Sequence, residues 1–250
     1  GWNISVTRCT AEDFDTSGPD VWDQFQGRFI ACTAYGQRVD NWYIAHNKTT
    51  NLTVRPSYFN QNTGEQLMWE DINAQDQARV ASAASNSVTF AQSIRGERIP
   101  WYANAVVVAG RGVGQSRQIM KYDDKSRTAT LSRNWRVIPD TNSVVLVCHN
   151  IQRVVVYENE LDGKPRAYQN EKHIASAGVE PFGGSHTMIV DGNLFHELRG
   201  GIETFGLEGS KKKVVAPTFF NLYSNNRFDH NRWGILHRGG ADASGSPRGA

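Results

Sequence analysis

The stretch Val190-Asp-Gly-Asn193-Leu-Phe195 decides the fold, because the same frame returns as Tyr223-Ser-Asn-Asn226-Arg-Phe228. In both copies Phe follows Asn by two positions, and five further residues lead to a Gly-Ile pair, at Gly201-Ile202 and at Gly234-Ile235. Each copy therefore contains a short β-prone stretch, a sharp bend at the Asn and a second strand that starts at Gly-Ile. Internal repeats of this kind are typical of stacked architectures.

The asparagines of this frame form a longer series. Val156-Tyr-Glu-Asn159-Glu-Leu161 precedes the two copies, and Ile44-Ala-His-Asn47 resembles an earlier one. Asn159, Asn193 and Asn226 are separated by 34 and 33 residues. Asn tolerates the left-handed backbone region at a bend and hydrogen-bonds its neighbours along a stack. Because stacked asparagines form a ladder in which each amide satisfies the next, the repeat predicts a β-solenoid.

These apolar-x-x-Asn-x-Phe steps, followed by Gly-Ile, resemble the coils of right-handed parallel β-helix proteins, the pectate-lyase-like superfamily. The resemblance covers residues 1–72 and 149–240. It is specific for the fold and not for an activity, since the superfamily includes polysaccharide lyases, glycoside hydrolases, pectin esterases and phage tailspikes. No single member family is matched, so the resemblance assigns no catalytic residue. It implies a solenoid that binds a polysaccharide.

The middle of the chain has a different sequence pattern, in which short β-prone runs are separated by turn residues. The runs are residues 87–90, 105–108, 116–120, 128–131 and 143–147. Asp123–Thr128 lies between two alternating runs, as in an antiparallel hairpin. We therefore expect an all-β protein in which a small antiparallel barrel or sandwich, residues 79–148, is inserted into the parallel β-helix. Its N-terminal coils are residues 1–78, and its C-terminal coils, residues 149–250, are expected to be incomplete at their end.

One glycine-rich run in this middle region resembles a phosphate-binding loop. Gly110-Arg-Gly112-Val-Gly114 lacks the Gly-Lys-Ser/Thr ending of such loops, and neither a βαβ unit nor a helix is expected around it. The run therefore predicts a tight β-turn. Together with Trp135 and the Pro139-Asp140 pair, it resembles a β-module found in some β-helix and phage tail proteins.

Composition limits the function further. The chain has 250 residues, with 27 Lys and Arg against 25 Asp and Glu, and its net charge of +2 excludes a broad cationic surface for nucleic acid. No apolar run approaches the roughly 18 residues of a membrane-spanning helix. The 7 Trp, 8 Tyr and 11 Phe argue against disorder. We expect a secreted or extracellular-surface protein with a polysaccharide partner, whose open coil ends are covered by further chain or subunits.

The cysteines leave two interpretations open. Cys9 and Cys32 occupy equivalent positions of a second, 23-residue repeat, Val6–Ala11 and Phe29–Ala34. On neighbouring coils their backbones would lie about 5 Å apart, which suits either a disulfide or a ladder of buried thiols. Cys148 has no positional partner. No Cys/His spacing indicates zinc, so no cofactor is expected to be required, and calcium is the metal left open.

A first acidic cluster lies where the inserted domain begins. Glycoside hydrolysis generally needs two carboxyl groups, one that protonates the leaving oxygen and one that activates water or attacks carbon. Glu65 and Glu70 flank Trp69, and strand alternation puts Glu65 on the same face as Trp69 and Glu70 on the opposite face. An acid beside Trp69 would be desolvated and its pKa raised, as a general acid requires. The alternative is a solvated strand end.

The repeat alignment predicts a second cluster. Glu203 and Leu236 occupy matching positions on neighbouring coils, and His237 takes the position of Thr204. Stacked coils place such side chains about 5 Å apart, so carboxylate, imidazole and guanidinium groups could meet on one sheet face. The polar and aromatic residues nearby are Glu197, Arg199, Asp229, His230, Arg232, Trp233 and Arg238. The alternative is ordinary polar decoration of a solvent-exposed face.

The resemblance implies a carbohydrate-active enzyme, and the clusters favour a glycoside hydrolase over a lyase because acids outnumber a clear basic arrangement. The expected catalytic residues are Glu203 and His237, then Asp229 and Glu197, with Glu65 and Glu70 as an outlying pair. The expected sugar-binding residues are Trp69, Arg199, Arg232, His230, Trp233 and Arg238. The competing hypothesis is a non-catalytic adhesin, phage tail-fibre or filament segment in which the solenoid is a rigid spacer.

Overall fold

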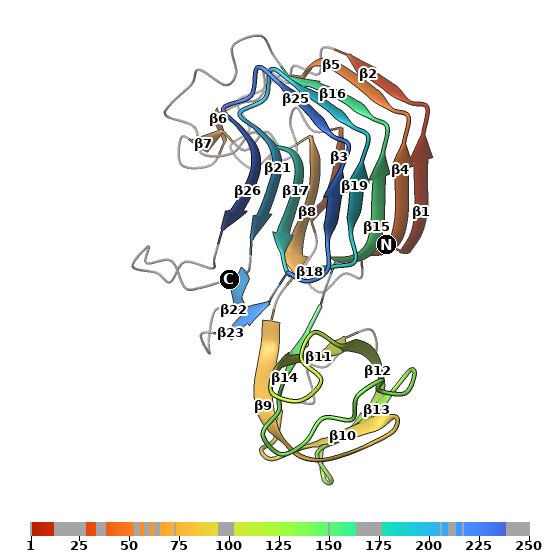
Figure 1. The fold of residues 1–250 in the computed structure, drawn as a ribbon, viewed down its shortest axis with the longest axis vertical. Helices are drawn as coiled ribbons and strands as arrows, with labels where there is room; N and C mark the ends of the chain where they lie inside the picture. Colours follow the sequence, from red (N-terminus) through yellow and green to blue (C-terminus); the bar gives the residue numbers. More distant parts are fainter. Residues whose placement is uncertain are drawn as a thin grey trace.

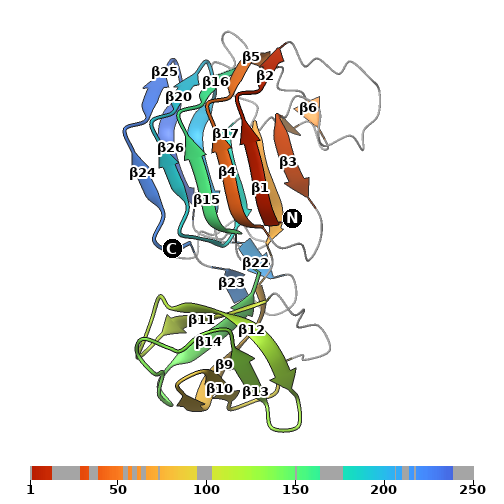
Figure 2. The same cartoon turned by 90° about the vertical axis from the view of Figure 1, so that its right-hand side faces the viewer.

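The computed structural model consists of β-strands joined by turns over the residues it describes. Those residues are 2–12, 29–33, 39–52, 56–57, 61–62, 66–72, 74–94, 103–149, 151–163, 177–205, 207–209, 214–216 and 218–238. Across these ranges, no helix is long and apolar enough to cross a membrane. Figures 1 and 2 show two bodies, a stack of parallel strands above and a small barrel below.

The upper body is a coil in which each turn of the chain adds one strand to each of three parallel sheets. Sheet A contains β1 (Trp2–Thr7), β4 (Asp40–Ala45), β15 (Ile151–Tyr157), β19 (Ile189–Asp191) and β24 (Leu222–Ser224). Sheet B contains β2 (Thr10–Glu12), β5 (Lys48–Leu52), β16 (Glu160–Gly163), β20 (Leu194–His196) and β25 (Arg227–Asp229). Sheet C contains β3 (Ile30–Thr33), β8 (Leu67–Ile72), β17 (Ala177–Gly183), β21 (Gly200–Phe205) and β26 (Trp233–Arg238).

Three smaller pairings accompany these sheets. The strand β18 (Ser185–His186) pairs with β15 in parallel. Two antiparallel pairs join β6 (Pro56–Ser57) to β7 (Gln61–Asn62) and β22 (Leu207–Gly209) to β23 (Val214–Ala216).

An asparagine ladder holds successive turns together at the bend between sheets A and B. The backbone N–H groups of Asn47, Asn159 and Asn193 each donate to the Oδ1 of the next Asn, ending at Asn226, over 2.9–3.0 Å. Each side-chain Nδ2 donates to the same Oδ1 over 2.9–3.0 Å. Because buried amides need partners, this shared acceptor fixes the register of the turns. The expected ladder is confirmed.

The left-handed backbone conformation lies one residue before each ladder position, and not at the Asn as the sequence pattern suggested. The residues with positive φ are Arg8 (56°), His46 (56°), Glu158 (48°), Gly192 (67°) and Asn225 (52°). The first turn has the same geometry without an Asn, because the N–H of Cys9 donates to the Oδ1 of Asn47 over 2.9 Å. The ladder therefore begins at a cysteine.

The 23-residue repeat around Cys9 and Cys32 does not correspond to a turn of the coil. Cys9 lies at the bend between sheets A and B, whereas Cys32 lies in β3 of sheet C opposite Trp69. The expectation that they stack on neighbouring coils is wrong, because the position of Cys9 returns after 38 residues, at Asn47. Cys9 is an exposed free thiol.

Large side chains fill the inside of the coil, and glycines make room for them. Phe195 and Phe228 stack with ring centroids 5.2 Å apart and an interplanar angle of 11°. A Cβ on Gly178 would lie 2.4 Å from Phe195, and one on Gly201 would lie 2.2 Å from Phe228. The glycine of one turn thus receives the Phe ring of the next turn, and only glycine admits a ring this close.

The lower body is a closed six-stranded antiparallel barrel in the order β10-β13-β12-β11-β14-β9. Its strands are β9 (Ala74–Ala84), β10 (Ser87–Phe90), β11 (Asn104–Ala109), β12 (Ser116–Asp123), β13 (Thr128–Leu131) and β14 (Val144–Cys148). Asp123 and Thr128 are register partners, which confirms the expected hairpin. The sequence pattern missed β9, which starts before residue 79.

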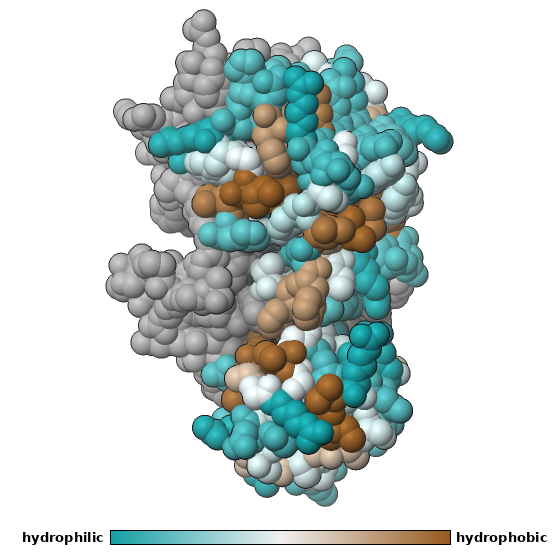
Figure 3. Space-filling view, viewed as in Figure 1, coloured by the Kyte–Doolittle hydropathy of each residue, from teal (hydrophilic) through white to brown (hydrophobic). Residues whose placement is uncertain are grey.

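Aromatic residues of the coil pack against the barrel. Phe219 packs on a small apolar group of the barrel that includes Val106, Leu146 and Cys148. Phe220 lies against Gly114, where an added Cβ would come within 2.9 Å of the ring. All three glycines of the Gly110–Gly114 run have positive φ, and the run forms a turn, as expected. In the view of Figure 3, hydrophobic patches lie on both bodies among hydrophilic atoms.

Candidate functional site

Two buried carboxylates lie side by side on sheet C. Val179 and Ile202 are register partners of β17 and β21 and belong to the core inside the coil. Alternation therefore puts the next residues, Glu180 and Glu203, on the outer face of the sheet. Neighbouring strands are about 4.8 Å apart, and the two glutamates are only 1% and 0% exposed. We call Glu180 and Glu203 the carboxylate pair.

Apolar side chains border the carboxylate pair along the same column. Met68 of β8 is the register partner of Glu180, and Leu236 of β26 is the register partner of Glu203. Met68 is 5% exposed. The pair is thus held between two apolar neighbours on a rigid sheet, where interactions between charges are stronger than in water.

An arginine and a tryptophan stack at the start of the same strands. The guanidinium carbon of Arg199 lies 4.9 Å from the ring centroid of Trp233. The ring lies on the backbone of Gly200, where a Cβ would come within 2.2 Å of its Nε1. Arg199 is 8% exposed. Glu203 is the third residue after Gly200, about 10 Å along the strand.

His237 lies on the other side of sheet C from the carboxylate pair. The predicted register is confirmed, because Glu203 pairs with Leu236 and Thr204 pairs with His237. Alternation turns Thr204 and His237 away from the face of Glu203. The hydroxyl of Thr204 shares a hydrogen bond with His237 Nδ1, and the ring of Tyr223 lies 5.8 Å from the imidazole. By this alternation Glu203 and His237 do not lie on one face of sheet C, as the repeat alignment had suggested.

A second column of ionisable side chains runs along sheet B. Asp162, His196 and Asp229 are register partners on three successive turns. The Nδ1 of His196 lies 3.1 Å from Asp162, and its Nε2 lies 3.7 Å from Asp229. Partial burial raises the pKa of Asp162, and the neighbouring His196 opposes this effect.

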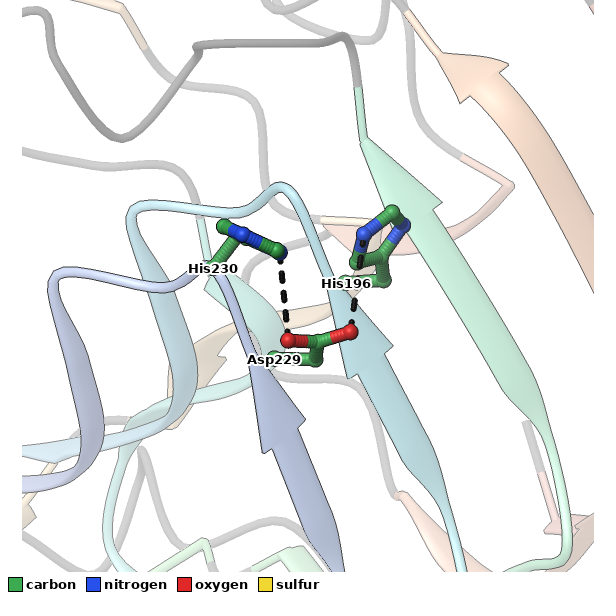
Figure 4. A group of neighbouring side chains, drawn as sticks. All are labelled: His196, Asp229 and His230. Atoms are coloured by element: carbon green, nitrogen blue, oxygen red, sulfur yellow. Dashed lines mark ion pairs between the residues drawn. The ribbon is translucent and has the colours of Figure 1, made fainter.

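His230 completes this group at the end of β25. Its Nδ1 lies 3.1 Å from Asp229, and its ring meets that of His196 edge to face with centroids 5.6 Å apart. Figure 4 shows Asp229 between the two imidazoles. Glu197 Oε1 is 4.0 Å from His196 Nε2. We call His196, Asp229 and His230 the histidine cluster. The structure thus brings together the predicted Glu197, Asp229 and His230, in a place separate from Glu203.

Trp69, the aromatic residue of the first predicted cluster, lies inside the coil. Trp69 is 0% exposed and packs edge to face on Trp42 inside the coil, with centroids 6.1 Å apart. Its expected contact with a surface sugar is therefore wrong, because β8 presents Leu67 and Trp69 to the core. Glu65 and the side chain of Glu70 lie outside the described residues.

The remaining residues that were expected to bind sugar do not form one group. Arg232 is exposed, and its N–H donates to the carbonyl of Arg199 over 3.0 Å. The backbone of Arg238 ends β26, and its side chain lies outside the described residues. Within the described part of this set, the side chains of Arg199 and Trp233 stack on each other.

Sequence reasoning missed Glu180 and Asp162, although a signal for each exists. Gly178-Val179-Glu180 repeats as Gly201-Ile202-Glu203, and the two triplets lie in register. Leu161-Asp162 precedes Phe195-His196 and Phe228-Asp229 in the same column. Aligning the residues after the core positions, and not only the asparagines, would have found both.

Comparisons with known proteins leave the family open. No family model matches the chain, and no curated protein matches it. One solved structure with local similarity is the tailspike protein gp49 from Pseudomonas phage LKA1, at 11% identity and a TM-score of 0.32. The similarity covers 82% of this chain and 35% of the tailspike chain. The chain therefore spans about a third of the length of that protein.

Proposed function

We propose that this chain is a polysaccharide-active right-handed parallel β-helix in which Glu180 and Glu203 cleave a glycosidic bond. The observation behind the proposal is the carboxylate pair on neighbouring strands of sheet C. A strand spacing of about 4.8 Å is close to the roughly 5–5.5 Å between the carboxyl groups of retaining glycosidases. The right hand follows from the general preference of parallel crossover connections.

The chemistry assigns one role to each carboxyl group. One donates its proton to the leaving glycosidic oxygen, and the other attacks the anomeric carbon to form a glycosyl–enzyme ester. The first then removes a proton from water, which hydrolyses the ester and restores both groups. Hydrolysis is favoured over β-elimination, because a pair of carboxylates repels the uronate carboxylate that an eliminating enzyme must neutralise.

The Arg199–Trp233 stack, at the start of the same strands, is the proposed sugar-binding surface. Aromatic faces bind sugar rings with large contact area at low entropy cost, and a guanidinium donates hydrogen bonds to hydroxyl groups. Because Glu180 and Glu203 are almost fully buried, the proposal requires the outer face of sheet C to open before a polymer reaches them. Polysaccharide as the substrate also places the protein at an extracellular surface.

The test is turnover on a panel of polysaccharides selected by glycan-array binding. New reducing ends without the ultraviolet absorbance of an unsaturated uronate indicate hydrolysis. Glu180→Gln and Glu203→Gln are each expected to lower turnover roughly 10²–10⁴-fold. The matched control is Glu160→Gln, since Glu160 is an exposed glutamate of sheet B paired with Lys48 at 2.8 Å. Full turnover in either buried variant, or no glycan bound by the wild type, contradicts the proposal.

A second candidate function, a non-catalytic segment of a larger fibre or adhesin, is supported by an apolar column on sheet A. Tyr43, Val155, Ile189 and Leu222 are successive register partners. Three of them are well exposed, at 40% for Tyr43, 38% for Ile189 and 53% for Leu222. Contiguous exposed apolar surface marks association sites. Light scattering tests this candidate: a stable oligomer that Ile189→Lys dissociates supports it, and a monomer contradicts it.

A further inference from the structure

The histidine cluster combines donors from two turns of the coil in an arrangement that an extended strand does not allow. Asp229 and His230 are adjacent in sequence, and adjacent residues of a strand point to opposite faces. His230 has a φ of 51°, so the chain bends at this residue and directs both side chains to one point. Glu197, with a φ of 52°, makes the same bend after His196 on the preceding turn.

We propose that His196, Asp229 and His230 bind a divalent transition-metal ion of the zinc class. One nitrogen or oxygen atom from each of the three residues lies within 4.8 Å of the others. The carboxylate oxygens of Asp229 lie 3.1 Å from His230 Nδ1 and 3.7 Å from His196 Nε2. Donors bound to one tetrahedral zinc ion at 2.0–2.2 Å are about 3.4 Å apart, so small side-chain adjustments close the site.

The partner of the second nitrogen of His196 supports a metal-binding role. Metal-bound histidines usually donate the other ring N–H to a carboxylate, which fixes the tautomer and the ring orientation. Here His196 Nδ1 lies 3.1 Å from Asp162 Oδ1, which leaves Nε2 directed toward Asp229. Asp162 comes from a third turn, so the carboxylate–histidine–metal arrangement would span three successive rungs of sheet B.

Charge and access also suit a cation. Glu197 Oε1, 4.0 Å from His196 Nε2, is near enough to act as a fourth donor. Arg227 is a cation beside the cluster, with its guanidinium 3.7 Å from Asp229, but its side chain is 76% exposed and can move away. The side chains of His196 and His230 are 34% and 58% exposed, so an ion enters from solvent. Two imidazoles select zinc, nickel, copper or cobalt and disfavour calcium, which prefers oxygen ligands.

The test is titration of the metal-free 250-residue chain with zinc chloride by calorimetry, and with cobalt chloride by visible absorption. We expect one ion per chain and a cobalt spectrum typical of nitrogen and oxygen ligands. His196→Ala and His230→Ala should each weaken zinc binding at least about 10-fold, and Asp162→Asn about 10–100-fold, because Asp162 orients a ligand. None of these measurements depends on glycan cleavage, so the metal site and the proposed hydrolase fail separately.

The matched control is His46→Ala. His46 is a similarly exposed histidine of the coil whose Nδ1 lies 3.3 Å from Glu158, and it lies outside the cluster. Its removal is expected to leave zinc affinity unchanged. The absence of a stoichiometric zinc site overturns the proposal, as does zinc binding that survives the double variant His196→Ala/His230→Ala. An equal loss of affinity in His46→Ala also overturns it, because it indicates adsorption to any surface histidine. Circular dichroism of each variant confirms that the coil remains folded.

Discussion

The coil and the barrel achieve stability in different ways. In the coil every long sheet is parallel, and each strand of the inner turns pairs with the turns before and after it, so each turn depends on its neighbours. In the barrel all pairings are antiparallel, and the sheet closes on itself without an edge. The two bodies also have separate hydrophobic cores. A change inside one body should therefore destabilise that body and leave the other folded.

The largest effect is expected from Phe195→Ala. Phe195 is fully buried and stacks on Phe228, so its removal leaves a cavity inside the coil. We expect the free energy of unfolding of the coil to fall by about 3–5 kcal/mol, while the barrel keeps its stability. Hydrogen exchange measured by mass spectrometry in increasing denaturant reports on peptides of each body.

The matched control is Phe90→Ala in the barrel, which is also fully buried. It should produce the opposite result, with faster exchange in the barrel peptides alone. Equal acceleration in both bodies for either variant would show that coil and barrel unfold as one unit.

The free energy of unfolding is expected to change with pH by about 3 kcal/mol, because of a buried histidine near the joint between the bodies. Burial lowers the pKa of His149 to about 4, from an ordinary value of 6.5. Below about pH 6.5, His149 therefore binds a proton in the unfolded chain but stays neutral in the folded chain. The contribution of neutral His149 to the free energy of unfolding is fully present above that pH and is lost as the pH falls toward 4.

The measurement is the midpoint of urea unfolding between pH 7 and pH 4. His149→Gln should flatten the dependence, because glutamine does not titrate in this range. His46→Gln, a change at an exposed histidine, should leave it as in the wild type. A steep dependence that persists in His149→Gln would assign the effect to other groups.

A smaller effect is expected from Asn193→Ala in the middle of the ladder. The change removes the acceptor for both the N–H and the side-chain amide of Asn159. Leaving buried donors without partners costs about 1–3 kcal/mol, again confined to the coil. Asn225→Gly is the control, because Asn225 is exposed, its side chain bonds only to Asp191 among the hydrogen bonds described, and glycine tolerates the positive φ that Gly192 also has at the matching position. Its effect should stay within about 0.5 kcal/mol.

The ladder shows which parts of the fold could be predicted from sequence. Asn47, Asn159, Asn193 and Asn226 were recognisable because each serves a local bend and a neighbouring turn at once. The first turn was hidden because Cys9 replaces the Asn and needs only its backbone N–H. In the barrel, β9 was missed because Ala and Gln dominate the strand and give weak alternation.

The candidate sites were predictable only in part. The register of Glu203 with Leu236 follows from counting residues, and the structure agrees. Which side of a strand faces the core does not follow from counting, so Trp69 was expected at the surface and lies inside. The histidine cluster depends on the positive φ of His230, and the presence of a histidine in the sequence does not predict that backbone conformation.

The way the barrel joins the coil has a consequence for how the chain folds. Asn47 and Asn159 bond to each other although 112 residues separate them, and closing so long a loop carries a large entropic cost. The barrel removes most of that cost, because its two end strands are neighbours and Ala74 is the register partner of Cys148. Once the barrel has folded, the loop that joins the second and third turns is effectively only a few residues long. The inserted barrel thus lowers the entropic cost of pairing the second turn with the third. A short linker in place of the barrel should let the coil close in the same register.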